Sequence, residues 1–200
     1  MQNILYMSAG APYLNITNMC PCRCVFCVRD SFDTVGGSGT LWLDAEPNFS
    51  QVKSAFDRFA PELYSEITFC GYGEPTCALD LLIETAEFIR GMSQIKIRLN
   101  TNGLSDLINK KPTAARIASV VDTVSISLNA PNSGRYCEVT RPCFGGESYE
   151  AMLQFAGECK SLGTETIFTV VNCIAQREIE ACRIIAQSKG IPLRVREMIE

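Results

Sequence analysis

Histidine is absent from the 200-residue chain, and basic residues are few. Without histidine, the chain cannot form His-ligated zinc sites, His-held haem, or Ser-His and Cys-His catalytic pairs. Lys and Arg number 18 against 22 Asp and Glu, and Lys110-Lys111 is the only adjacent basic pair. The electrostatic footprint of a nucleic-acid-binding protein is therefore missing, and we expect no direct binding to nucleic acid.

Long apolar runs and an early positive charge are also lacking. No hydrophobic segment approaches the ~18 residues that a membrane span needs. No Lys or Arg precedes Arg23, so the cationic start of a secretory signal is missing. We expect a cytoplasmic protein without membrane association. With 46% hydrophobic residues, the chain is expected to form a single globular domain over residues 1–200.

Cysteine, by contrast, is abundant: the chain has 11, an odd number that excludes complete pairing in a disulfide scaffold. Four of them lie in the run Cys-Pro-Cys-Arg-Cys-Val-Phe-Cys, where Cys20, Cys24 and Cys27 have the spacing Cys-x3-Cys-x2-Cys. Three thiolates from one loop suit a [4Fe-4S] cluster with one iron left open, whereas structural zinc usually takes four ligands. Zinc stays an alternative in which the fourth ligand is Cys22, Cys70 or Cys77.

Six short β-branched runs predict strands, and helical patterns separate them. The runs are 13–17, 66–70, 95–100, 123–128, 166–171 and 193–198. This alternation predicts parallel strands with right-handed crossovers. In the fourth run Ser125 and Ser127 alternate with Val124 and Ile126, and a sheet covered by helices on both faces would lack such a polar face. We therefore predict an α/β fold, a partial (β/α)6 TIM-like barrel with a polar lumen.

Polar motifs follow the ends of the predicted strands. Phe-Cys-Gly-Tyr-Gly-Glu-Pro-Thr, residues 69–76, comes after the second strand, where barrel enzymes place functional groups and where glycines allow a close approach of backbone to ligand. Asn-Thr-Asn-Gly, residues 100–103, follows the third strand, and Ser-Ile-Ser-Leu-Asn-Ala, residues 125–130, covers the end of the fourth. Taken alone, a Gly-Glu-Pro turn is more often a plain strand-to-helix connection.

Together, the cysteine motif, the aromatic Phe26 and the Gly-Tyr-Gly-Glu-Pro motif resemble the radical S-adenosylmethionine (SAM) superfamily. Tyr72 stands where that superfamily has a glycine. More narrowly, five segments are similar to the TatD-linked radical SAM proteins, which occur beside or fused to TatD-type nucleases. These segments are residues 69–76, 98–103, 125–132, 141–142 and 194–197.

The resemblance implies an enzyme in which Cys20, Cys24 and Cys27 hold a [4Fe-4S] cluster. It implies that SAM is cleaved reductively to a 5′-deoxyadenosyl radical, which abstracts hydrogen from a substrate that the sequence does not identify. Glu74, with the backbone around Gly73, would accept from the amino group of SAM. The other implied contacts to the cofactors are Phe26, Pro75, Asn100, Thr101, Ser127 and Asn129. Strand alternation favours Asn100 and the family element favours Thr101, so both are kept.

The implied partners are a flavodoxin- or ferredoxin-type reductant and a protein partner or TatD-type nuclease. Alternatives within the superfamily are a glycyl-radical activase and a small-molecule enzyme of the carboxy-deazaguanine type. The alternative outside it is a structural or electron-carrying Fe–S or zinc protein.

Several other residues have two interpretations. Arg98, Arg194 and Arg196 either bind an anionic substrate or form structural ion pairs. Residues 137–146, which include Cys137 and Cys143, are expected at the mouth of the barrel, where a mobile stretch, a partner or the substrate covers the opening. Cys159 and Cys182 lie in helical patterns and are expected to be small core residues.

Overall fold

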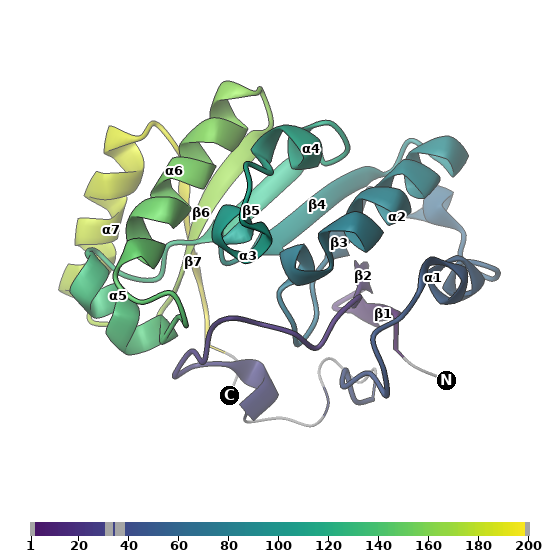
Figure 1. Ribbon diagram of the computed structural model, residues 1–200, viewed down its shortest axis with the longest axis horizontal. Coiled ribbons are helices and arrows are strands. Elements are labelled where there is room, and N and C mark those ends of the chain that lie inside the picture. The colour runs from purple at the N-terminus through teal and green to yellow at the C-terminus, as the bar shows by residue number, and fades with distance from the viewer. Residues whose placement is uncertain (1–2, 31–33, 35–38, 199–200) are drawn as a thin grey trace.

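One seven-stranded sheet organises the computed structural model, which describes residues 3–30, 34 and 39–198 (Figure 1). The strands lie in chain order: β1 (Leu5–Ser8), β2 (Ala11–Leu14), β3 (Glu66–Phe69), β4 (Lys96–Thr101), β5 (Thr123–Ser127), β6 (Glu165–Val171) and β7 (Leu193–Arg196). β1 runs antiparallel to β2, and every later pair is parallel. In the described sheet β1 and β7 are the two edges, so the sheet is not closed.

The predicted partial barrel is confirmed, because β2 to β7 are six parallel strands in sequential order. The last strand, β7, ends at Arg196 rather than at residue 198. The larger differences lie at the amino-terminal end of the sheet. β2 ends at Leu14 rather than at residue 17, because the chain from Asn15 onwards leaves the sheet to contact other loops. β1 was not predicted: Leu-Tyr-Met-Ser has no β-branched residue, and the hairpin depends on the tight turn at Ala9 and Gly10, both with positive φ.

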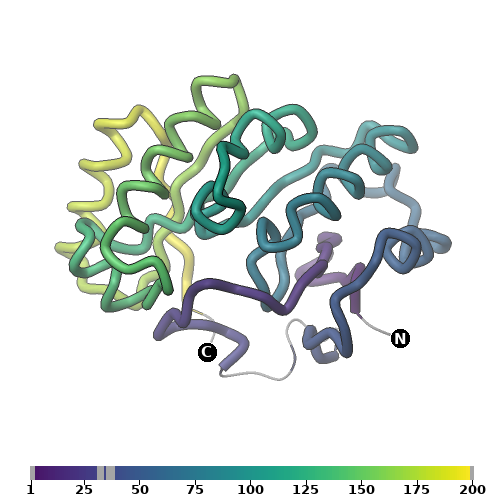
Figure 2. The backbone as a smooth tube through the Cα atoms, in the orientation of Figure 1, coloured from purple at the N-terminus to yellow at the C-terminus, as the bar shows by residue number. Residues whose placement is uncertain are grey.

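Helices cover one face of the sheet. They are α1 (Phe49–Ala55), α2 (Leu79–Met92), α3 (Ser105–Asn109), α4 (Ala114–Ala118), α5 (Ser133–Thr140), α6 (Glu147–Ser161) and α7 (Gln176–Ser188), with short 3-10 helices η1 (Val28–Asp30), η2 (Pro61–Leu63) and η3 (Pro75–Ala78). Figure 2 traces the chain after β2 across the side away from α2, α4 and α6. Within the described residues, no helix has the length and apolar character needed to cross a membrane.

The two faces of the sheet differ as the alternation predicts. Ile97, Leu99, Val124 and Ile126 are fully buried and form the core beneath the helices, together with Cys159 and Cys182. The opposite face is polar. The register places Arg98 beside Thr123, Asn100 beside Ser125 and Ser127 beside Thr169. The polar residues of successive strands therefore form rows across the face opposite to the helices.

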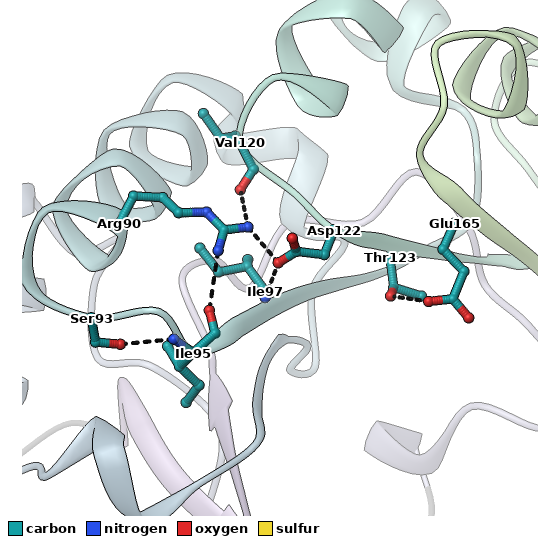
Figure 3. Close-up of polar contacts among 8 residues, drawn as sticks. All are labelled: Arg90, Ser93, Ile95, Ile97, Val120, Asp122, Thr123 and Glu165. Carbon is teal, nitrogen blue, oxygen red and sulfur yellow. Dashed lines mark hydrogen bonds and ion pairs between the residues drawn. The ribbon is translucent and has the colours of Figure 1, made fainter.

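An ion pair fastens the amino-terminal ends of β4 and β5 (Figure 3). Arg90 of α2 pairs with Asp122, and its guanidinium also donates to the Ile95 carbonyl at 3.2 Å and the Val120 carbonyl at 3.4 Å. Asp122 Oδ2 in turn accepts from the Ile97 amide at 2.7 Å. These bonds fix the register of the two strands at the end opposite to the polar motifs, so they help to position the motifs themselves.

Candidate functional site

Three loops meet at the carboxyl ends of the strands. The segment after β2 carries the cysteines, and it lies directly against the loop after β3. A Cβ atom at Gly73 would be only 2.2 Å from the Thr17 carbonyl oxygen, so no larger residue fits there. The next amide, that of Glu74, donates to the Met19 carbonyl at 2.8 Å. The small size of Gly73 is therefore required by packing between these two loops.

Glu74 connects the loop after β3 to the loop after β4. Its side chain is only 4% exposed. Oε1 accepts from the Thr76 amide at 3.1 Å, the Thr76 hydroxyl at 2.8 Å and the Thr101 hydroxyl at 2.7 Å, while Oε2 accepts from the Asn102 amide at 2.7 Å. Burial raises the pKa of Glu74, and these hydrogen bonds act in the opposite direction.

The acceptor capacity of Glu74 is not fully used. A carboxylate has about four acceptor positions, two on each oxygen. Oε1 already receives three donors, whereas Oε2 receives one in the described structure. A further donor, such as the amino group that the family resemblance implies, would therefore bind at Oε2. That contact stays a prediction, and the structure adds a bridging role that the sequence did not indicate.

The two candidates at the end of β4 have different surroundings. Thr101 is buried and its hydroxyl donates to Glu74. Asn100 is half-buried on the polar face. Thr101 thus supports the bridge made by Glu74, and Asn100 is the one available to a ligand in the lumen.

The cysteine loop separates its thiols by burial. Cys20, Cys24 and Cys27 are half-buried, whereas Cys22 is 2% exposed and belongs to the core. The Cys22 thiol accepts from Asn102 Nδ2 at 3.7 Å. Hydrogen bonds to Cys20 and Cys24 raise the pKa of Cys22, and the bond to Cys22 lowers that of Cys20. Burial raises the pKa of Cys27.

These thiols provide the right donor chemistry for an iron–sulfur cluster. Across residues 3–30, 34 and 39–198, no three Cys, Asp or Glu side chains converge closely enough to hold a metal ion. The loop nevertheless presents three partly accessible thiols with the predicted spacing and buries the fourth. Cluster binding therefore requires the side chains of Cys20, Cys24 and Cys27 to turn toward one another, while Cys22 stays in the core.

Helix α5 holds the cysteine loop in place. The Arg23 amide donates to the Thr140 carbonyl at 3.0 Å, and the Val25 amide donates to the Val139 carbonyl at 2.9 Å. The Cys143 amide donates to the Pro21 carbonyl at 2.9 Å. Residues 137–146 were expected at the mouth of the barrel, as one of three candidates to cover its opening. They form the end of α5 and the turn after it, and both pair with the cysteine loop. The free amides of that loop donate hydrogen bonds to the last carbonyls of the helix, which have no partner within the helix.

The end of β5 carries an unsatisfied acceptor. Asn129 is 5% exposed and has a left-handed φ of 53°. No described residue donates a hydrogen bond to its Oδ1. Buried polar atoms are almost always paired, so this oxygen fits a hydroxyl or amino group of a bound ligand. Ser127 is half-buried two residues earlier on the polar face of β5.

Phe26 and Pro75 have structural surroundings. Phe26 packs, partly buried, against the main core. Pro75 is buried at the first position of η3, where its fixed φ suits the start of a helix. The structure thus explains the positions of both residues without a ligand, and their predicted contacts to the cofactors stay predictions.

The packing of Tyr72 explains why a large residue stands where the superfamily has a glycine. Tyr72 is buried with Tyr6 and Leu41, and its ring lies edge-on to Trp42 with 5.1 Å between centroids. The segment that carries Leu41 and Trp42 is held by Asn15, whose Nδ2 donates to the Leu41 carbonyl at 2.6 Å. The larger residue therefore packs beneath a segment that sequence reasoning did not connect with the site.

The family comparison decides the identity of this arrangement. The model of the Radical SAM superfamily matches residues 14–180, which include the cysteine loop, Glu74 and Asn129. The chain belongs to the radical SAM superfamily. A [4Fe-4S] cluster and SAM are the cofactors of this superfamily. The thiols of the cysteine loop and the orphaned oxygen of Asn129 fit these cofactors.

Solved structures agree in fold. AdoMet-bound anSMEcpe has 18% identity and a TM-score of 0.64, over 94% of this chain and 51% of that chain. SuiB from Streptococcus suis bound to S-adenosylmethionine has 18% identity and a TM-score of 0.67, over 94% of this chain and 40% of that chain. A radical SAM methyltransferase from Sphaerobacter thermophilus has 18% identity and a TM-score of 0.58, over 96% and 68% of the two chains.

The likeness to these structures concerns the fold alone, given the low identity. The chain spans about half the length of the first two, at 51% and 40% of those chains. A comparison with curated protein sequences gave no match.

The cysteine assignment predicts the iron content of single variants. Cys20→Ala, Cys24→Ala and Cys27→Ala are expected to lose most of their cluster iron after anaerobic reconstitution, because a cubane needs these thiolates. Cys22→Ala is expected to keep it, as is the control Cys173→Ala at an exposed cysteine. Iron and sulfide assays measure the content. A complete cluster in Cys24→Ala, or a loss confined to Cys22→Ala, would show that a different triplet binds the metal.

The bridging role of Glu74 predicts a loss of stability. Glu74→Gln is expected to lower the free energy of unfolding by about 1–3 kcal/mol, because its amide group would face a backbone or hydroxyl donor. Urea titration measures the change, with Glu62→Gln at an exposed position as control. Equal stability of the variant and the wild type would exclude the bridge.

The same Glu74→Gln variant tests the contact with SAM. Its affinity for SAM is expected to fall by about 1.5–3 kcal/mol, the usual loss for a charge-assisted hydrogen bond. Its iron content is expected to stay near normal. Equilibrium binding to the reconstituted protein measures the affinity, and an unchanged value in a folded variant would remove Glu74 from the SAM site.

Proposed function

We propose that this protein cleaves SAM reductively and abstracts a hydrogen atom from an anionic or bulky substrate. The observation that carries the proposal is the meeting of the cysteine loop, the Glu74 loop and the loop after β4 at the carboxyl ends of the strands. The parallel strand β5 ends at the same edge of the sheet. The chemistry that the cofactors supply when bound is one-electron cleavage of SAM to methionine and a 5′-deoxyadenosyl radical. The protein supplies binding, orientation and exclusion of water.

Each motif has a separate task in this proposal. Cys20, Cys24 and Cys27 hold the cluster. Glu74 Oε2 and the backbone at Gly73 receive the amino group of SAM, while Glu74 Oε1 stays bound to Thr76 and Thr101. At the other end of the ligand, Asn129 Oδ1 accepts from a polar group of SAM, with Ser127 and Asn100 on the same polar face. This assignment is supported by the acceptor left on Glu74 and by the orphaned oxygen of Asn129.

Within the superfamily, we propose that the chain belongs to the TatD-linked group. Five segments of the sequence support it, including residues 69–76 and 194–197. We further propose that residues 1–200 form one radical SAM core domain in the cytoplasm, with a TatD-type nuclease or another protein as partner. A glycyl-radical activase and a carboxy-deazaguanine-type enzyme stay as alternatives for the reaction.

The open sheet supports a partner or a bulky substrate. β1 and β7 are unpaired edges in the described sheet, so the lumen between them has a lateral opening. A radical must be shielded from solvent while it reacts. Residues 137–146 are engaged with the cysteine loop. We propose that the substrate or a partner covers the opening.

The decisive test is the formation of 5′-deoxyadenosine. Reconstituted protein with SAM and dithionite is expected to release it, whereas a structural or electron-carrying Fe–S protein would not. Asn129→Gly is expected to weaken SAM binding about tenfold, because it removes one hydrogen-bond acceptor worth about 1.4 kcal/mol. Glycine tolerates the left-handed backbone at this position, so the fold is retained.

The matched control is Lys110→Gly. Lys110 has the same φ of 53°, and it caps α3, outside the three loops of the site. It is expected to bind SAM as the wild type does. Absence of 5′-deoxyadenosine from cluster-loaded wild type would reject the proposed chemistry, and equal SAM affinity of Asn129→Gly and wild type would remove Asn129 from the site.

A basic pocket beside the cysteine loop supports an acidic electron donor. Arg23, Cys24, Val25, Arg29, Asp30 and Arg141 line a pocket of about 510 Å³. Arg23 and Arg141 are exposed, and Val25 is 54% exposed beside them. An exposed apolar residue among arginines fits the acidic surface of a flavodoxin- or ferredoxin-type reductant, although the net charge of the chain is −4. We propose that the reductant docks here.

Charge reversal tests this docking surface. Arg23→Glu and Arg141→Glu are expected to slow 5′-deoxyadenosine formation driven by reduced flavodoxin several-fold at low salt, because steering depends on charge. With dithionite as the reductant, the rates are expected to match the wild type. Arg183→Glu, at an exposed position on α7, is the control. Equal slowing with both reductants would mean that the variants damage the site itself.

A further inference from the structure

Two arginines of β7 lie at the same level along the strands as the residues proposed to bind SAM. The sheet register pairs Ser127 with Thr169, and Thr169 with Arg194, so Arg194 is level with Ser127 across one intervening strand. Arg196, paired with Val171, is two residues nearer the carboxyl end of β7, on the same face of the strand. Neighbouring strands are about 4.8 Å apart, so β5 and β7 are separated by about 10 Å. A small molecule placed between SAM and β7 would contact both strands.

Both side chains project from the polar face. Leu193 and Val195 alternate with them and pack, partly buried, against the core. Arg194 and Arg196 therefore extend from the opposite, uncovered side of the strand, where they are exposed. The same face carries the polar rows of β4 and β5, so the arginines belong to the lumen.

The charges of these arginines reach the other end of the sheet. Arg196 and Arg194 both act to lower the pKa of Tyr13 on β2, and Arg196 acts to lower that of Cys70, although burial raises both.

An ion pair neutralises the charge of Arg98, the third arginine of this face. Arg98 Nε lies 2.7 Å from Glu66 Oε1, at the amino-terminal end of β3 and β4. For Arg98, the structural ion pair that the sequence left open is the observed arrangement. Among the described residues, neither Arg194 nor Arg196 has a carboxylate within ion-pairing distance. Arg194 and Arg196 therefore carry positive charge without a described ion-pairing partner at the carboxyl-terminal part of this face.

We propose that Arg194 and Arg196 bind the anionic group, a carboxylate or a phosphate, of the molecule from which hydrogen is abstracted. This inference rests on the proposed function and assigns its substrate class. Two guanidinium groups one step apart on the same strand face provide several donors with full charge, which is the recognition that such an anion requires. The anion holds the substrate on the β7 side of the lumen, and SAM lies on the β4 and β5 side.

The simpler structural role of these residues is protection of an edge strand. β7 is an edge in the described sheet, and charged side chains on edges discourage pairing with other chains. That role needs charge but no binding of a defined anion. It predicts association of the protein when the arginines are replaced, and it predicts no saturable binding of small anions by the wild type.

Calorimetric titration of the cluster- and SAM-loaded protein separates these roles. The probes are malonate and inorganic phosphate, which distinguish a carboxylate site from a phosphate site. Saturable binding of at least one probe by the wild type is expected, and Arg194→Gln and Arg196→Gln are each expected to weaken it at least about tenfold. Arg183→Gln, an exposed arginine of α7, is the matched control with unchanged affinity.

The outcomes are decisive in both directions. Saturable binding that depends on Arg194 and Arg196 supports the proposal. Absence of binding by the wild type, or affinities that Arg194→Gln and Arg196→Gln leave unchanged, would overturn it. Formation of 5′-deoxyadenosine by the same wild-type preparation is measured in parallel, so a failure of the proposed SAM chemistry is recognised separately from a failure of the anion site.

Discussion

The buried carboxylate of Glu74 is the contact on which the site depends. It accepts from the loop after β4 through Thr101 and Asn102 and from its own loop through Thr76, while its amide donates to the cysteine segment at Met19. Burying a charge is costly unless hydrogen bonds compensate it, and here four donors do so. Three loops that are far apart in the sequence are thus held to one another by a single residue.

The packing of these loops also limits which residues they accept. Gly73 lies against the backbone of Thr17, and Cys22 is enclosed in the core with its thiol against Asn102. The free amides of Arg23 and Val25 are satisfied by the last carbonyls of α5. The cysteine loop therefore has a fixed backbone from Pro21 to Val25, and the adjustment needed for metal binding falls on its side chains. Such preorganisation reduces the entropy lost when the cofactors bind.

The alternation of polar and apolar residues predicted those strands whose faces have different surroundings. The alternation of Ser125 and Ser127 with Val124 and Ile126 predicted both the strand β5 and its polar face, because side chains of a strand alternate between faces. β1 escaped detection because it is short and because its position depends on a turn with positive φ. The pairing of α5 with the cysteine loop was not predictable, because it joins backbone atoms of residues more than a hundred positions apart and involves no distinctive side chain.

Contacts between distant segments also limited what the sequence could predict about the site. Motif spacing predicted the cysteines, and the family resemblance predicted Glu74 and Asn129, but neither distinguished the roles of Asn100 and Thr101. That distinction depends on which side of β4 faces the Glu74 carboxylate, and the structure places Thr101 there. Tyr72 was recognised as a departure from the family pattern, yet its packing against Trp42 and Leu41 requires a segment some thirty residues earlier to return over the loop. Contacts between distant segments decide such cases.

The distribution of arginines separates two routes into the proposed site. Arg23, Arg29 and Arg141 surround the outer side of the cysteine loop, where the pocket includes Cys24. Arg194 and Arg196 lie on the polar face of β7, level with the residues proposed to bind SAM. An electron donor must approach the cluster closely from outside, whereas a substrate radical must be kept from solvent. One opening cannot serve both needs, because a donor that occupied the lumen would displace the substrate. The pocket beside the cysteine loop and the arginines of β7 are separate basic surfaces, so the reductant and the substrate that we propose would not compete for one place.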